Sequence, residues 1–97
     1  MSARDQALAA GVPAFACDRI EETARSLATS DHAEGFGTDA CVHLGFAQRE
    51  ATRDNRRDAL CEAMESQGDV FNRATFRLAW VAYATHLMAL NAGMVES

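Results

Sequence analysis

The chain has 97 residues, which is enough for one domain with one hydrophobic core and too few for two. Its 14 acidic and 9 basic residues give a net charge of −5, which argues against direct nucleic-acid binding because nucleic-acid-binding surfaces are basic. Hydrophobic residues make up 48% of the chain, but many of them are alanine, which favours helix and adds little area to a core.

The hydrophobic pattern indicates helices throughout. Proline occurs once, at Pro13, and no run of residues alternates between apolar and polar as a half-buried strand would. We therefore expect an all-α fold, a compact bundle of three to five helices around a hydrophobic C-terminal helix at about residues 70–91, with residues 1–97 forming a single helical domain.

The cysteines and the first residues bear on the cellular compartment. Cys17, Cys41 and Cys61 are odd in number and form no CxxC pair, which does not suit a disulfide framework. The first eleven residues lack the long apolar run of a secretory signal. Both observations favour a reducing compartment, and we expect the protein in the cytoplasm.

A short helix opens the chain. Ser2 and Asp5 have the spacing of a capping box, in which each side chain satisfies a backbone N–H at the start of a helix. The sequence therefore predicts a helix over residues 3–10, ended by Gly11, because glycine adopts the left-handed conformation that terminates helices.

An amphipathic helix and a loop come next. Pro13 is tolerated in a first helical turn, and apolar residues recur at helical spacing from Pro13 to about Thr29. Polar residues and two glycines between Ser30 and Gly37 predict a connecting loop, with Thr38 placed to cap the following helix.

The middle of the chain is helical in one of two ways. Helical spacing of small residues runs from Thr38 to about Gln67, which predicts one long helix. Asn55 interrupts the pattern and, with Asp58 three residues later, also fits a helix cap. The alternative is therefore two helices, over residues 38–52 and 56–67.

The last helix is expected to organise the fold. Asp69 can cap a helix that runs from Val70 to about Asn91 and stops near Gly93. The stretch from Leu78 to Val95 is apolar enough to be tested as a membrane span, but its histidine, asparagine and small alanines favour a buried core helix. The large side chains expected in the core are Phe15, Ile20, Leu27, Phe36, Leu44, Phe46, Leu60, Met64, Phe71, Phe76, Leu78, Trp80, Tyr83, Leu87, Met88 and Leu90.

One stripe of this helix is a candidate oligomer interface. A helix that is apolar most of the way round lies at the centre of a fold or is shared with another chain. We therefore consider a homodimer formed through the aromatic and aliphatic stripe Phe76, Trp80, Tyr83 and Leu87.

Few residues are candidates for chemistry. Cys41 lies near an expected helix start, where the helix dipole lowers a thiol pKa, but His43 two residues on points to another side of the helix. His86 lies in the apolar helix, where a single histidine is usually a satisfied core residue. The sequence has no phosphate-binding loop, no dinucleotide fingerprint and no metal motif such as HExxH, so we expect no cofactor and no metal.

Two charged surfaces are predicted from helical spacing. The first, called here the acidic ridge, has no basic residue between positions 58 and 72 and consists of Asp58, Glu62, Glu65 and Asp69. The second, called here the basic face, consists of Arg49, Arg53, Arg56 and Arg57.

These features favour a small non-enzymatic protein that acts by binding another protein through its surface. An acidic ridge suits a basic groove on a partner, including a groove that normally holds nucleic acid. In size, acidity and lack of motifs, the chain resembles in kind the small phage-encoded inhibitors of host defence, such as anti-CRISPR proteins, and this resemblance rests on no specific residue. The alternatives are a minimal thiol-reactive helical enzyme using Cys41 and a helix-turn-helix DNA-binding module using Arg49 to Arg57.

Overall fold

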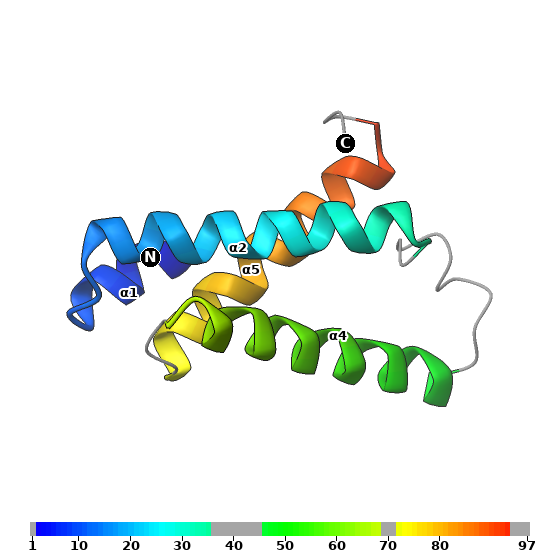
Figure 1. Ribbon diagram of the computed structural model, residues 1–97, viewed down its shortest axis with the longest axis horizontal. Helices are drawn as coiled ribbons and strands as arrows, with labels where there is room; N and C mark the ends of the chain where they lie inside the picture. Colours follow the sequence, from blue (N-terminus) through cyan, green and yellow to red (C-terminus); the bar gives the residue numbers. More distant parts are fainter. Residues whose placement is uncertain (1, 36–45, 69–71, 94–97) are drawn as a thin grey trace.

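The protein is an all-α bundle, as the sequence predicts. The computed structural model describes residues 2–35, 46–68 and 72–93, with the backbone alone for 46–53 (Figure 1). Within these ranges every regular element is a helix, and the helices are α1 (Ala3–Ala9), α2 (Ala14–Ala33), α4 (Phe46–Ser66) and α5 (Arg73–Asn91).

Helices α2 and α5 form the central packed pair. They make the most extensive contact in the molecule and run in the same general direction, with α5 crossing behind α2 (Figure 1). The short helix α1 packs against both of them at the start of α2. Helix α4 runs in the opposite direction to α2, along one side of the pair, and contacts both helices less extensively.

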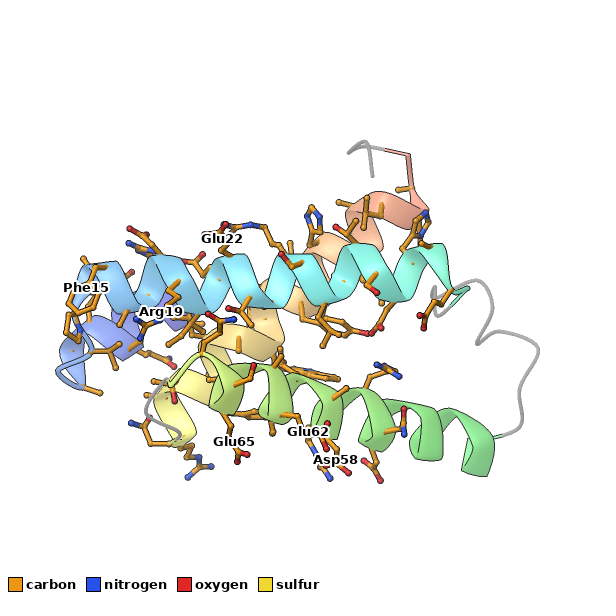
Figure 2. All side chains as sticks on the ribbon, in the orientation of Figure 1. Phe15, Arg19, Glu22, Asp58, Glu62 and Glu65 are labelled. Carbon is orange, nitrogen blue, oxygen red and sulfur yellow. The ribbon has the colours of Figure 1, made fainter. Side chains whose placement is uncertain are left out.

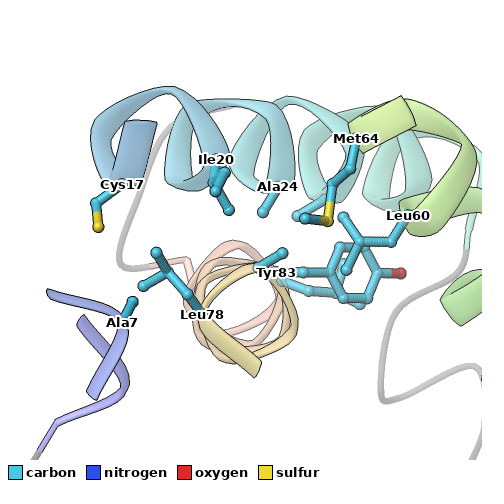
Figure 3. Packing of buried hydrophobic residues seen from close by; sticks show 11 residues of the cluster. Ala7, Cys17, Ile20, Ala24, Leu60, Met64, Leu78 and Tyr83 are labelled. Atoms are coloured by element: carbon cyan, nitrogen blue, oxygen red, sulfur yellow. The ribbon is translucent and has the colours of Figure 1, made fainter. Parts of the chain in front are cut away.

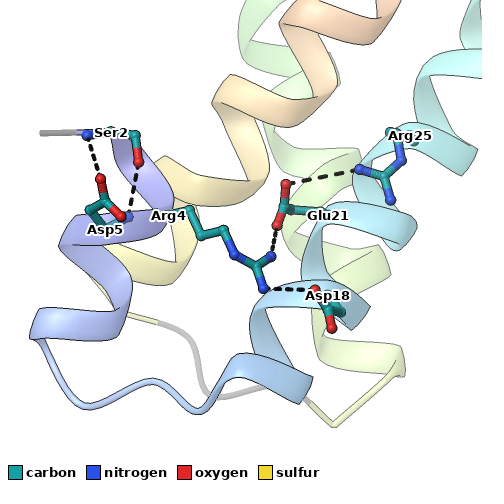
Figure 4. Close-up of polar contacts among 6 residues, drawn as sticks. All are labelled: Ser2, Arg4, Asp5, Asp18, Glu21 and Arg25. Carbon is teal, nitrogen blue, oxygen red and sulfur yellow. Dashed lines mark hydrogen bonds and ion pairs between the residues drawn. The ribbon is translucent and has the colours of Figure 1, made fainter.

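Helix α1 begins and ends as its sequence predicts. Ser2 Oγ accepts a hydrogen bond from the backbone N–H of Asp5 at 3.1 Å, and the Asp5 carboxylate accepts one from the Ser2 backbone at 3.4 Å (Figure 4). Gly11 has a φ of +95°, a left-handed conformation that a side chain would disfavour, and it turns the chain toward α2. The capping box prediction is therefore confirmed.

Arg4 connects α1 to α2. Its guanidinium is 2.8 Å from the Asp18 carboxylate and also bonds the Glu21 carboxylate, which pairs in turn with Arg25 at 3.9 Å (Figure 4). Asp18 is largely exposed, with 70% of its side chain accessible. The Arg4–Asp18 pair is therefore of the exposed kind that contributes little to stability, whereas the Arg4–Glu21 pair is more buried, with side chains 37% and 23% exposed.

The core lies where α1, α2 and α4 face α5. Small residues such as Ala24 and Ala79 are completely buried there beside larger side chains such as Ile20 and Leu78, which suits close packing of α2 on α5. Figure 3 shows Ile20 and Ala24 of α2 turned toward α5. The buried apolar residues are Ala7, Cys17, Ile20, Ala24, Ala28, Leu60, Met64, Leu78, Ala79, Tyr83, Leu87 and Leu90.

Two residues expected in the core lie on the surface. Phe15 is 69% exposed and Met88 is 60% exposed. Phe15 lies in the first turn of α2 on a side that is open to solvent, and the Arg19 guanidinium lies 6.0 Å from its ring centroid. Met88 lies on an exposed part of α5, beside Thr85 and Ala92. Of the other expected core residues, Phe36, Leu44 and Phe71 lie outside the described residues, as does the side chain of Phe46.

Helix α2 is longer than predicted. Residues Ser30 to Ala33, expected in a loop, form its last turn, and the left-handed Gly35, with a φ of +90°, follows its end. The polarity of this turn misled the prediction, because Asp31 is a buried residue that makes contacts with other helices. Thr38, expected to cap the next helix, lies outside the described residues.

Helix α4 is continuous through Asn55, so the two-helix alternative is wrong over residues 46–66. Asn55 is exposed, and its side-chain oxygen accepts a hydrogen bond from Arg56 at 2.9 Å instead of capping a new helix. The expected start at Thr38 lies outside the described residues.

Helix α5 begins three residues later than predicted. Its cap is Asn72, whose side-chain oxygen accepts from the Thr75 backbone N–H at 3.0 Å, while Thr75 Oγ1 accepts from the Asn72 N–H at 2.9 Å. Asp69, the expected cap, lies outside the described residues. The predicted end near Gly93 is confirmed, since Gly93 has a φ of +71°.

The apolar C-terminal helix can be tested as a membrane span against the structure. Over the described ranges, no helix combines the length and the apolar character that crossing a membrane requires. Helix α5 instead uses Leu78, Tyr83 and Leu87 as core residues of the bundle.

Candidate functional site

Helix α4 has an acidic outer face. Asp58, Glu62 and Glu65 are exposed, and they project away from α2 and α5 (Figure 2). At about 100° per residue, positions 58, 62 and 65 lie within roughly 60° of one another around the helix. The structure thus places three members of the acidic ridge on one surface. The fourth, Asp69, lies outside the described residues.

The outer face extends one turn further than the sequence analysis proposed. Asp54 is exposed and lies one turn before Asp58 on the same side of α4. Arg57 lies between them, with its guanidinium 3.7 Å from Asp54 and 4.0 Å from Asp58. Glu62 and Glu65 therefore form the end of the ridge that is farther from a cation.

The inner face of α4 is built from different residue types. Leu60 and Met64 are fully buried against the core, one turn apart (Figure 3). Arg56 continues the same side of the helix one turn earlier, with 16% of its side chain exposed. Its Nε donates to Asp31 Oδ2 at 3.0 Å.

Asp31 joins three helices. Its side chain is only 2% exposed and accepts two hydrogen bonds at Oδ2, from Arg56 of α4 and from the Tyr83 hydroxyl of α5 at 2.6 Å. Burying a carboxylate without such donors would cost on the order of several kcal/mol, which is the desolvation penalty of an ion. The polar cluster Asp31, Arg56 and Tyr83 therefore fixes how α4 lies on the α2–α5 pair.

Tyr83 is held in its neutral form. Burial, together with the hydrogen bond to Asp31, raises the pKa of the Tyr83 hydroxyl above its ordinary value. Its ring also packs on Trp80, with ring centroids 5.4 Å apart, and Trp80 stacks on Phe76 at 6.2 Å.

Part of the stripe proposed as an oligomer interface is buried within the chain. Tyr83 is 3% exposed and Leu87 is 8% exposed, and both belong to the core. Within the single chain the surface of these two residues is already covered, and a homodimer through the stripe stays a prediction. Phe76 and Trp80 are half-buried beside them.

The basic face does not form as one surface. Arg56 turns inward to Asp31, while Arg57 is half-exposed and paired with Asp54. The side chains of Arg49 and Arg53 lie outside the described part of the chain. An arginine surface that includes Arg56 is therefore wrong, since α4 uses that residue for its own attachment.

The described cysteines are buried or partly buried, and the described histidines make contacts between helices. Burial raises the pKa of both the Cys17 and the Cys61 thiol, which lowers their reactivity at neutral pH. His86 Nε2 lies 3.3 Å from Thr29 Oγ1, and His32 Nδ1 lies 2.8 Å from Asn91 Oδ1, so both histidines bridge α2 and α5. Cys41 and His43 lie outside the described residues.

The surface of the described part has several hollows. A groove of about 470 Å³ between α2 and α4 has mostly polar walls, including Thr23, Ser26 and Ser66. A hollow of about 290 Å³ beside Phe15 is more apolar. A third, of about 330 Å³, lies on α5 around Met88. Among the described residues, no group of three or more His, Cys, Asp or Glu side chains has the arrangement of a metal site.

Comparison with family models, with characterised proteins and with solved structures found no match for this chain.

Proposed function

We propose that this chain is a non-enzymatic binding protein that contacts another protein through the acidic ridge of α4. The observation that carries the proposal is the exposure of Asp58, Glu62 and Glu65 on the side of α4 opposite Leu60 and Met64. Leu60, Met64 and Arg56 on the inner face contact the rest of the bundle, whereas these outer carboxylates face away from it.

The expected partner presents a basic groove. Carboxylates one helical turn apart are separated by a distance comparable to the Debye length, which is about 8 Å at physiological salt. Their electric fields therefore add. Charges arranged in this way accelerate association with a basic surface and orient the complex, and their effect falls as salt rises. A net charge of −5 supports the same preference and disfavours nucleic acid itself as the ligand.

The proposal extends to a groove that otherwise holds nucleic acid. Such grooves present arginine and lysine in rows, which is the complement of a row of carboxylates. A phage or mobile-element inhibitor of a host defence complex, similar in kind to anti-CRISPR proteins, is the setting we propose for it.

The test compares two variants of equal charge. In Glu62→Lys/Glu65→Lys, the ridge loses the end that is farther from Arg57. In the control, Glu22→Lys/Glu34→Lys, two other exposed acids are reversed instead, one on α2 and one at its C-cap. Each tagged protein is used to capture partners from a nuclease-treated lysate of the native host, and the captured protein is identified by mass spectrometry.

The proposal expects one protein to be retained by the wild type and the control and lost from the ridge variant, with all three proteins equally helical by circular dichroism. The purified partner should then bind the wild type less tightly as salt rises. Equal capture by the ridge variant and the control, or capture of no specific protein by the wild type, would overturn it.

A further inference from the structure

Helix α4 is attached to the rest of the molecule by a narrow strip of its surface. Of its side chains from 54 to 66, those turned fully inward are Leu60 and Met64, and Arg56 continues that strip with 16% of its side chain exposed. Helices α2 and α5, by contrast, bury residues along most of their length against each other. The contact of α4 with either of them is correspondingly small.

The strip has two chemically different parts. Leu60 and Met64 lie beside Tyr83 and contribute apolar burial (Figure 3). Arg56 contributes a charge-assisted hydrogen bond to a carboxylate that is almost entirely removed from water. This ion pair is much more buried than the Arg57 pairs on the same helix, whose side chains are 50% exposed or more.

Separation of α4 would leave the remaining helices with most of their contacts. Ala7, Cys17, Ile20 and Leu78 pack together at the α1 side of the core, away from Leu60 and Met64 (Figure 3). Asp31 would regain water and keep Tyr83 as a donor on the neighbouring helix. Among the described side chains of α4, the cost of opening therefore falls mainly on Leu60, Met64 and Arg56.

We propose that α4 is a cover that opens as a unit, before the α1–α2–α5 body unfolds, and that the Arg56–Asp31 ion pair is the latch that holds it closed. Opening exposes Leu60, Met64 and the aromatic edge at Tyr83 to solvent. The proposal does not depend on what the outer face of α4 binds.

The test is native-state hydrogen exchange on the full wild-type chain at increasing, sub-denaturing urea. We expect the amides of Leu60 and Met64 to exchange on the order of 10-fold or more faster, relative to their intrinsic rates, than the slowest amides of α2 and α5. Their opening should also depend less on urea, because it exposes less surface. A single opening constant and a single urea dependence for all three helices would overturn the proposal.

Variants in the two regions give a second, independent readout. Arg56→Met leaves Asp31 buried without its cation, which destabilises the closed state relative to both the open and the unfolded states. Exchange of α4 should rise by roughly 100-fold or more, and globally exchanging amides of α2 and α5 should rise by the same factor. Removing both charges, in Asp31→Asn/Arg56→Met, should reverse most of the increase.

Core variants in the body should behave differently. Leu78→Ala, or the milder Ile20→Val, destabilises the closed and the α4-open states alike. The global amides should then exchange faster, whereas the α4 amides keep their wild-type opening constant as long as global unfolding stays the rarer event. Equal acceleration of α4 and the body by these substitutions would contradict separate opening. The matched surface control is Asp54→Asn, in the exposed pair with Arg57, which should leave all amides within about 3-fold of wild type.

Discussion

The α2–α5 pair and helix α4 show two ways of holding a helix in one small domain. Helices α2 and α5 interlock through small side chains that allow close approach, with Ala24, Ala28 and Ala79 completely buried between larger neighbours. Helix α4 is of similar length but is polar, and it is attached through Leu60, Met64 and the Arg56 ion pair. Apolar contact distributed along a helix holds its position through many residues, whereas a helix with few contacts depends on each of them for its attachment.

The largest effect should come from the apolar pair. Leu78→Ala removes a side chain that is 3% exposed, and we expect it to lower the free energy of unfolding by about 2–5 kcal/mol, because a buried leucine leaves a cavity. The control is Met88→Ala on the same helix, which removes a side chain that is 60% exposed and should cost less than about 0.5 kcal/mol. Urea unfolding followed by circular dichroism measures both. Similar losses in the two variants would mean that the burial difference along α5 does not set stability.

A smaller effect is expected where α5 meets the polar cluster. Tyr83→Phe keeps the ring and removes the hydroxyl that donates to Asp31 at 2.6 Å. Hydrogen bonds to charged groups contribute about 1.5–3 kcal/mol, so a loss of that order is expected in urea unfolding at pH 7. A loss below about 0.5 kcal/mol would show that Arg56 alone satisfies the Asp31 carboxylate.

The same hydroxyl predicts a pH dependence. The folded protein raises the Tyr83 pKa above the value near 10 of an unfolded tyrosine, so the folded state holds this proton more tightly. The stability gained from Tyr83 is complete below pH 10 and is lost as pH rises through the folded pKa. Unfolding measured from pH 8 to 11.5 should show a decline in the wild type above about pH 10 that is smaller in Tyr83→Phe. Parallel curves for the two proteins would contradict the assignment.

The smallest effect is expected on the outer side of α4. Asp54→Asn removes one partner of the exposed Arg57, and such pairs contribute about 0–1 kcal/mol. Thermal or urea unfolding should show a change within about 0.5 kcal/mol of wild type. A loss as large as that of Tyr83→Phe would mean that the outer face also holds α4 in place.

Most of the fold can be predicted from local signals in the sequence. The all-α class, the Ser2–Asp5 capping box and the stop at Gly93 follow from backbone requirements that one or two residues satisfy. The end of α2 is less well predicted, because the polar residues Ser30 and Asp31 resemble a loop although the terminating Gly35 lies further on.

The tertiary contacts cannot be predicted from the sequence pattern. Asp31 is 25 residues from Arg56 and 52 from Tyr83, and no helical or strand spacing relates them. Arg56 turns inward, away from the basic face, and Phe15 is exposed in the first turn of α2 although its helical spacing matches that of core residues. The acidic ridge was easier to predict, because three of its members lie on one helix and depend only on local geometry.

The most direct test of how α4 is held is a double-mutant cycle between Asp31 and Arg56. Unfolding free energies are measured in urea for the wild type, Asp31→Asn, Arg56→Met and the double variant. A latch predicts a coupling energy of about 2 kcal/mol or more, with the double variant more stable than Arg56→Met alone. A coupling energy below about 0.5 kcal/mol would show that the two residues act independently and that Leu60 and Met64 hold α4 without them.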